Sequence, residues 1–305
     1  MKHITLLLGA SGQLGHALQV SLKTLGAVVA CTRADLDLAQ APAILKSKIE
    51  ALMRQHQPTI VVNASAYTAV DRAEVETEVA YQVNAVAPGV LARAAQAGGA
   101  CFVHYSTDYV FKGDQATPYV ETDSVAPQSV YGKSKLEGEQ AVTRACARAL
   151  IFRTSWVVSA HGGNFLKTML KLAQERDSLK IVSDQVGAPT SAKLLANCTT
   201  EVLQALLAER VTDPRWGLYH LTAGGQTNWH AYACYVIAQA RGAGWPIKVQ
   251  DPAITPIATV DYPVAAVRPL NSRLDTSKIR ETFGVTLPDW SVGVDEVLLT
   301  LKSSA

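Results

Sequence analysis

A glycine-bearing turn near the amino terminus constrains the fold of this chain more than any other feature. The apolar segment His3 to Leu8 runs directly into Gly9 to Gly15, and leucines with helical spacing follow. In a dinucleotide-binding turn the first glycine permits the tight bend, the second lets a pyrophosphate approach the backbone, and the third lets the helix pack close to the strand. The helix amino terminus then offers unpaired N–H groups to phosphates. We predict cofactor contacts from Gly9, Ser11, Gly12, Gln13, Leu14 and Gly15.

Strand and helix patterns alternate through the first half of the chain without hairpin signals. This predicts an α/β fold, a Rossmann-type doubly wound parallel sheet, with expected strands at 3–8, 28–31, 59–64, 100–105 and 149–153. After residue 155, helical patterns at 165–175, 191–208 and 229–241 are separated by long loops with proline and glycine. We expect a dinucleotide-binding domain at 1–155 plus about 183–225, and a smaller substrate-binding lobe at 156–182 and 226–305.

Composition narrows the function classes. A chain of 305 residues with 48% hydrophobic and 18% charged residues is typical of a soluble globular protein. A net charge of +2 provides no basic field for nucleic acid or an anionic membrane, and no apolar run approaches the roughly 20 residues of a membrane helix. Five scattered cysteines without a C-x-x-C pair favour a reducing cytoplasm, and histidine spacing predicts no metal site.

The ends of the second and third expected strands indicate which cofactor binds. The strand ending at Cys31 is followed by Thr32 and Arg33, about 20 residues past the glycines, where this fold contacts the adenosine ribose. An acidic residue there would accept the 2′-hydroxyl of NAD, whereas Arg33 suits the 2′-phosphate of NADP. We predict NADPH and leave NADH open. The other expected cofactor contacts are Asp37, Leu38, Asn63, Ala64, Ala66 and Tyr67.

Acid–base chemistry at a carbonyl is indicated by Tyr131 and Lys135, which lie four residues apart in a helical pattern that continues as an alanine-rich run to Ala149. A neighbouring ammonium would lower the phenol pKa from its ordinary value of about 10 toward the working range. Thr107, after the expected fourth strand, could hold the carbonyl oxygen in front of Tyr131. The three residues form a predicted carbonyl-reducing triad.

Together these motifs resemble the extended short-chain dehydrogenase/reductases over nearly the whole chain. The resemblance rests on Gly9 to Gly15, Thr32 to Leu38, Val62 to Asp71, Tyr105 to Phe111, Tyr131 to Lys135, Arg153 to Trp156, Asp184 to Thr190 and Arg268 to Ser272. It implies that NADPH or NADH delivers a hydride to C4 of dTDP-4-dehydro-6-deoxy-L-mannose to give dTDP-L-rhamnose. In that reaction Tyr131 would protonate the alkoxide, Lys135 would bind the nicotinamide ribose, and Thr107 would orient the keto group.

The resemblance also implies a set of substrate contacts. An arginine suits the diphosphate because its planar fork pairs with phosphate oxygens. The contacts expected from the resemblance are Thr68, Val70, Thr107, Asp108, Tyr109, Trp156, Arg268 and Asn271.

One departure from the family bears on assembly. Some members dimerise through magnesium held by acidic residues, one of which follows a Gly-Ala-Pro-Thr motif, but this chain has Lys193 there. Magnesium takes oxygen ligands, so we expect no bridging metal and a monomer rather than a metal-bridged dimer. Two alternatives stay open: another nucleotide-sugar reductase, epimerase or dehydratase on the same triad, and a non-catalytic NADP-binding regulatory subunit.

Overall fold

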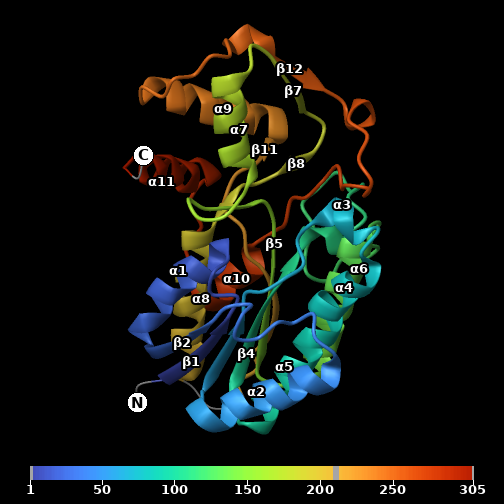
Figure 1. Cartoon of the computed structure of the whole chain (residues 1–305), viewed down its shortest axis with the longest axis vertical. Helices are drawn as coiled ribbons and strands as arrows, with labels where there is room; N and C mark the ends of the chain where they lie inside the picture. Colours follow the sequence, from blue (N-terminus) through green and yellow to red (C-terminus); the bar gives the residue numbers. More distant parts are fainter. Residues whose placement is uncertain (1–2, 209–212, 304–305) are drawn as a thin grey trace.

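The computed structural model describes residues 3–208 and 213–303, and its centre is a six-stranded sheet (Figure 1). All neighbouring strands pair in parallel, in the order β10-β5-β4-β3-β1-β2. The strands are β1 (His3–Leu8), β2 (Gly26–Cys31), β3 (Ile60–Asn63), β4 (Cys101–Thr107), β5 (Ala149–Thr154) and β10 (Gly217–His220). The predicted Rossmann-type parallel sheet is confirmed.

Helices cover both faces of this sheet (Figure 1). One face carries α1 (Gln13–Ser21), α8 (Ala192–Leu207) and α10 (Ser277–Phe283). The other carries α2 (Pro42–His56), α5 (Ala87–Ala97) and α6 (Val130–Ala145). Because β1 lies between β2 and β3, the chain reverses its direction across the sheet there. Ligands of open α/β sheets bind at such a switch point, beyond the carboxyl ends of the strands.

The helical region expected at 73–97 is divided into several pieces. It consists of α3 (Val70–Ala73), α4 (Thr77–Tyr81), a π-helical turn η2 (Gln82–Val86) and α5. Inside this turn, the Asn84 side chain pairs with both backbone groups of Tyr67, accepting at 2.8 Å and donating at 3.1 Å. Isolated π-turns inside helices occur frequently at functional sites. Here the turn fixes the chain that follows β3.

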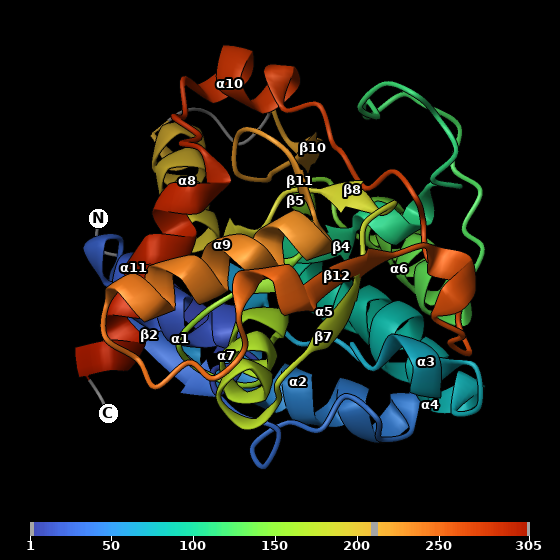
Figure 2. The ribbon, with the colours of Figure 1, turned by 90° about the horizontal axis from the view of Figure 1, so that it is seen from above.

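A second cluster of helices lies above the carboxyl ends of the strands (Figure 2). Its core is formed by α7 (Phe165–Glu175), α9 (Trp229–Gly242) and α11 (Trp290–Ser303). Short strand pairs join its loops: β7 (Leu179–Val182) with β12 (Ile254–Ile257), β8 (Val186–Gly187) with β11 (Thr227–Asn228), and β6 (Val157–Val158) with β9 (Thr190–Ser191). Single helical turns are η1 (Leu22–Thr24), η3 (Asp108–Val110), η4 (Asp251–Ala253) and η5 (Thr259–Asp261).

The expected domain boundaries remain a prediction. Helix α10 falls within the range assigned to the lobe, yet it contributes Ile279 to the core on the α8 face of the sheet. No helix of residues 3–208 and 213–303 is long and apolar enough to span a bilayer.

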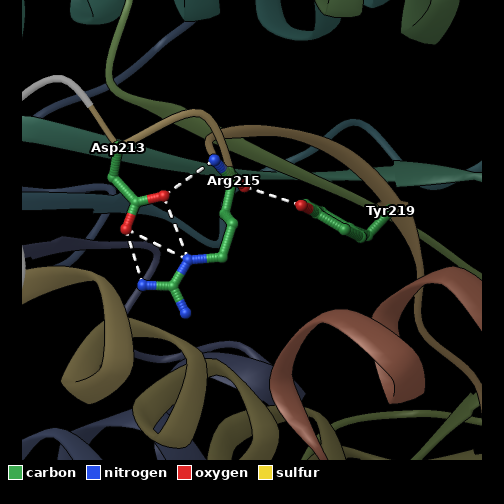
Figure 3. A network of polar contacts seen from close by, with 3 residues as sticks. All are labelled: Asp213, Arg215 and Tyr219. Atoms are coloured by element: carbon green, nitrogen blue, oxygen red, sulfur yellow. Dashed lines mark hydrogen bonds and ion pairs between the residues drawn. The ribbon is translucent and has the colours of Figure 1, made fainter.

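The segment entering β10 is held by a local polar network (Figure 3). The Arg215 guanidinium donates to both carboxylate oxygens of Asp213, at 3.0 and 2.6 Å. The Tyr219 hydroxyl donates to the Arg215 carbonyl at 2.6 Å. Since Tyr219 belongs to β10 and packs in the core, the network ties this segment to the edge of the sheet.

Candidate active site

The turn after β1 has the geometry that its glycines require. Gly9 has a φ of +78°, and a Cβ there would lie 2.6 Å from the Ser65 hydroxyl oxygen. A Cβ on Gly15 would lie 2.0 Å from the Gly9 carbonyl oxygen. A side chain at either position would clash with neighbouring atoms of the protein, so both positions require glycine.

Gly12 differs from these two glycines. Its φ is −76°, and a Cβ there would meet only the Gly9 carbonyl oxygen, at 3.3 Å. Gly12 is the N-cap of α1, and no side chain caps that end of the helix. The helix thus presents uncapped N–H groups beside a residue without a side chain, which fits a pyrophosphate.

The end of β2 carries the residues expected at the adenosine. Arg33 is exposed over 79% of its side chain, and its Nε lies 3.3 Å from an Asp37 carboxylate oxygen. Asp35 closes the turn by accepting from the Thr32 backbone and hydroxyl, both at 2.8 Å. The buried Leu38 offers its carbonyl to Gln82. Arg33 therefore lies in solvent beyond the end of the strand, and its contact with a phosphate stays a prediction.

Residues after β3 line the adjoining part of the same edge. Asn63 is buried, and the Ala64 N–H donates to Leu8 in β1 at 3.0 Å. The Tyr67 hydroxyl donates to Glu76 at 2.6 Å, and this bond raises the pKa of the Tyr67 phenol. The neighbouring expected contacts Ala66 and Thr68 lie in the short segment between β3 and α3, and Val70 is the first residue of α3.

Thr107 and Tyr131 meet at the carboxyl end of β4. Thr107 is the N-cap of η3 and accepts from the Tyr109 N–H at 3.2 Å. Its hydroxyl donates to Asp108 at 3.0 Å and also lowers the pKa of the Tyr131 phenol. The ring of Tyr109 packs edge-on against that of Tyr131, with centroids 5.4 Å apart. Thr107 and Tyr131 therefore lie together at this strand end, which is the placement expected of two groups that act on one carbonyl oxygen.

The acid–base character of Tyr131 differs from the sequence-based expectation. Burial raises the pKa of Tyr131 to about 12, the nearby Thr107 hydroxyl opposes this rise, and Asp108 adds to it. Lys135 donates to the Tyr105 carbonyl oxygen at 2.5 Å and contributes nothing resolved to the Tyr131 pKa. The expected lowering of the Tyr131 pKa by the Lys135 ammonium is therefore wrong for this structure, because burial dominates.

The pKa of Lys135 is also shifted. It is among the largest fully buried side chains of the described residues, and burial lowers its pKa to about 8, partly opposed by Glu139. Helix α6 places Lys135 under the end of β4. The helix ends at Ala145, short of the expected Ala149, because β5 begins at Ala149. A lysine with such a pKa exchanges its proton near neutral pH.

Asp108 is a buried carboxyl next to the Thr107–Tyr131 pair. Burial raises its pKa to about 6, although hydrogen bonds, including that from Thr107, oppose the rise. Carboxyls with such raised pKa values concentrate at functional sites. The finding is consistent with the expected substrate contact and adds a second group that titrates near neutral pH.

The remaining expected substrate residues lie on three different segments. Trp156, just after β5, has a φ of +47°, an uncommon backbone conformation for a bulky residue. Arg268 donates to Asp71 at 2.6 Å, while its buried Nε has no partner among the described residues. Asn271 uses both amide donors on the carbonyls of Gln115 and Thr117.

Asn271 also accepts at 3.0 Å from the backbone N–H and at 2.8 Å from the side chain of Arg273. Its amide is thus fully used inside the protein, which gives it a structural role. Substrate contact by Asn271 stays a prediction. Arg268, with an unpaired N–H and one carboxylate partner, retains the capacity to bind an anion.

Sequence reasoning missed two residues that support the site. Asn84 also donates to Ser134 in α6 at 3.1 Å, so it connects the segment after β3 to the catalytic helix. His104 is completely buried and faces both Asn63 and Lys135. The available signal was a histidine inside the apolar strand Cys101–Thr107.

No group of three or more histidine, cysteine, aspartate or glutamate side chains in the described part of the chain could hold a metal ion. Lys193, where an acidic ligand was considered, pairs with Glu296 of α11 at 3.0 Å.

The glycine turn after β1 and the Thr107–Tyr131 pair after β4 lie at the same edge of one parallel sheet, because parallel strands end together. This combination defines a dinucleotide-dependent oxidoreductase of the short-chain type. The chain belongs to the family described as RmlD substrate binding domain, whose model matches residues 1–303.

Individual relatives agree with this assignment. The chain is 45% identical over 293 residues to dTDP-4-dehydrorhamnose reductase of Escherichia coli K12, covering 96% of each chain. The solved structure of a dTDP-4-dehydrorhamnose reductase from Clostridium acetobutylicum matches with a TM-score of 0.87 and 36% identity, over 98% of this chain and 99% of that one. The enzyme of the same name from Bacillus anthracis, in complex with NADP, has a TM-score of 0.86 and 32% identity, over 98% and 100%. The family resemblance drawn from the sequence is confirmed.

Proposed function

We propose that this protein reduces the C4 keto group of dTDP-4-dehydro-6-deoxy-L-mannose, forming dTDP-L-rhamnose in dTDP-rhamnose biosynthesis. The observation that carries the proposal is that Thr107 and Tyr131 lie together at the sheet edge that also carries the glycine turn. The 45% identity to an enzyme named for this reaction supports the choice of substrate.

The residues perform the chemistry of a carbonyl reduction. NADPH, when bound, supplies the hydride that adds to C4. The Thr107 hydroxyl holds the keto oxygen in front of Tyr131, and the phenol of Tyr131 donates the proton as the C–O double bond becomes an alcohol. A buried phenol with a raised pKa remains protonated at neutral pH, so its proton is available for donation. Lys135 binds the nicotinamide ribose hydroxyls.

The remaining contacts follow the order of the sheet. The cofactor phosphates bind at Gly9, Gly12, Gly15 and the amino terminus of α1, because the missing Cβ atoms leave room for them and the uncapped N–H groups can donate to them. Arg33 takes the 2′-phosphate, which favours NADPH while NADH remains a second cofactor to test. The NADP complex of the Bacillus anthracis relative supports this choice. The proposed sugar contacts are Asp108, Tyr109 and Trp156, and Arg268 takes the diphosphate.

We also propose that the protein is a monomer in the cytoplasm. The exposed Lys193–Glu296 ion pair occupies the position where acidic residues could have held magnesium. The cysteines Cys31, Cys101, Cys146, Cys198 and Cys234 form no disulfide, which suits a reducing compartment.

The direct test mixes purified protein with NADPH and dTDP-4-dehydro-6-deoxy-L-mannose. We expect loss of reduced nicotinamide with dTDP-L-rhamnose as the product, and a loss of roughly 100-fold or more in kcat for Tyr131→Phe. Turnover with a different nucleotide sugar would assign another substrate. Tight NADPH binding without any turnover, and no effect of Tyr131→Phe, would point to a regulatory subunit and overturn the proposal.

A further inference from the structure

His104 is a buried titratable residue to which the proposed reaction assigns no role. It lies in β4, three residues before Thr107, with no exposed surface. Its Nδ1 lies 3.2 Å from the Asn63 amide nitrogen, and its Nε2 lies 3.4 Å from Lys135 Nζ. Burial, and then the Lys135 charge, hold the pKa of the His104 imidazole well below its ordinary value, so the ring is neutral. This ring joins the end of β3 to the catalytic lysine.

The orientation of the Asn63 amide fixes the proton on this ring. The backbone N–H of Ser65 donates to Asn63 Oδ1 at 3.1 Å, and only an oxygen can accept that bond. The amide nitrogen of Asn63 must then face His104 and donate to Nδ1. A neutral imidazole accepts at one nitrogen and donates at the other, so its proton lies on Nε2.

The Nε2–H of His104 consequently points at Lys135 Nζ. An ammonium has three donors and no lone pair, so it cannot accept this hydrogen, whereas an uncharged amine can. The amine retains two N–H groups, one of which serves the Tyr105 carbonyl at 2.5 Å. The Asn63 amide, the His104 ring, the Lys135 side chain and the Tyr105 carbonyl all have hydrogen-bond partners only when Lys135 is neutral.

We propose that His104 is a positioning residue of the reductase site, which presents its Nε2–H to Lys135 and favours the uncharged amine. The inference rests on the proposed reduction for its kinetic consequence, but its structural content is independent of the substrate. Other titratable groups around Lys135 among the described residues are Tyr131 and Glu139 on its own helix and Arg153 of β5, which pairs with Glu139. Glu139 favours the ammonium, so His104 and Glu139 act on Lys135 in opposite directions.

Proton exchange at Lys135 is the functional consequence. Burial and His104 both act against the ammonium, and the Lys135 pKa of about 8 lies within reach of physiological pH. When Lys135 carries its ammonium, it can return one proton to the Tyr131 phenolate after the phenol has donated its own, and the uncharged amine that remains accepts the Nε2–H of His104.

The test uses His104→Leu, which removes the Nε2–H, and Asn63→Asp. A carboxylate at residue 63 would accept from Nδ1–H, so Nε2 would become an acceptor for the Lys135 ammonium. In both variants we expect the alkaline midpoint of kcat/KM for NADPH-dependent reduction to rise by about one pH unit. The matched control is His220→Leu, a buried histidine of β10 whose Nδ1 faces the Asp275 carbonyl at 3.2 Å, and its midpoint should not move.

A second readout does not depend on turnover. Only an uncharged amine is acylated, so the pH dependence of trace acetylation at Lys135, followed by mass spectrometry, reports its pKa directly. Near-UV circular dichroism confirms that each variant is folded. An unchanged acetylation midpoint in both folded variants would overturn the role of His104, even with reductase activity intact. If the wild-type protein has no reductase activity but the acetylation midpoint of Lys135 still shifts in the two variants, the proposed function is overturned and the His104 inference stands.

Discussion

The indole rings of Trp156 and Trp229 stack face to face, with centroids 3.6 Å apart and planes 16° apart. Trp156 follows β5 of the sheet, and Trp229 begins α9 of the upper helical cluster. Trp229 is held in place because its Nε1 donates to Gln185 at 3.1 Å. A side chain proposed to touch the sugar is thus positioned by the part of the chain that lies above the strand ends.

Trp229→Leu should therefore weaken substrate binding more than it weakens chemistry. Trp156 has a strained φ of +47°, and losing the stacked ring would free it to leave that conformation. We expect KM for the sugar nucleotide to rise about tenfold, with kcat changed less than threefold, since an aromatic pair contributes roughly 0.5–1.5 kcal/mol beyond area burial. Loss of the coupled-indole signal in circular dichroism would verify the change, and an unchanged KM would contradict the positioning role.

Two glycines of the turn should respond differently to alanine. Gly15→Ala places a methyl group 2.0 Å from the Gly9 carbonyl oxygen, so we expect destabilisation by about 2 kcal/mol or more. Gly12→Ala meets nothing in the protein closer than 3.3 Å, so stability should change by less than about 1 kcal/mol while NADPH affinity falls at least tenfold. Thermal unfolding and NADPH fluorescence titration distinguish the two. Equal NADPH affinity in Gly12→Ala and wild type would remove the phosphate role.

Asp108 should make stability depend on pH. The folded pKa of Asp108 is about 6, above its ordinary value of 3.8. Its contribution to stability is therefore fully present below pH 3.8 and is lost as pH rises through about 6. Asp108→Asn keeps the acceptor for Thr107 and removes the buried charge. We expect the variant to be more stable than wild type at pH 8, by up to about 3 kcal/mol, and equally stable near pH 4. Denaturant titrations at both pH values measure the difference, and an equal gain at both would show that charge is not the cause.

Glu139 and Arg153 form a buried, bidentate ion pair, with N–O distances of 2.9 and 2.7 Å. Glu139→Gln leaves the Arg153 charge buried and unpaired, so we expect a loss of about 3–5 kcal/mol in stability. It also removes the carboxylate that raises the Lys135 pKa, so the alkaline midpoint should move down, opposite to the shift in His104→Leu. The matched control is Glu296→Gln in the exposed pair with Lys193, which should cost less than about 1 kcal/mol. An upward shift of the midpoint in Glu139→Gln would be inconsistent with this network.

The cofactor preference can be tested at Arg33. Its side chain is exposed and carries one carboxylate partner, Asp37, at 3.3 Å, so its replacement should not disturb the fold. Arg33→Ala should raise KM for NADPH at least tenfold and change KM for NADH little, because only NADPH carries the 2′-phosphate. A parallel loss for both cofactors would move the phosphate contact to another residue.

Local sequence determined the elements and the order of the site. The strand His3–Leu8, the turn at Gly9 and the helix at Gln13 were predictable because glycine sterics, apolar runs and helical spacing depend on neighbours in the chain. The same reasoning placed Thr107 at a strand end and Tyr131 and Lys135 on one helix. It did not anticipate the π-helical turn at Gln82–Val86, since a π-turn leaves no mark in the apolar pattern.

Only the tertiary structure decided how the groups of the site are charged and paired. Burial raises the pKa of Tyr131 and lowers that of Lys135, and burial is a property of the whole packed molecule. Arg268 meets Asp71 across 197 positions of sequence, and no local pattern carries a contact of that range. The sequence thus determined which functional groups the protein has and on which elements they lie, while packing between distant segments decided their protonation and their partners.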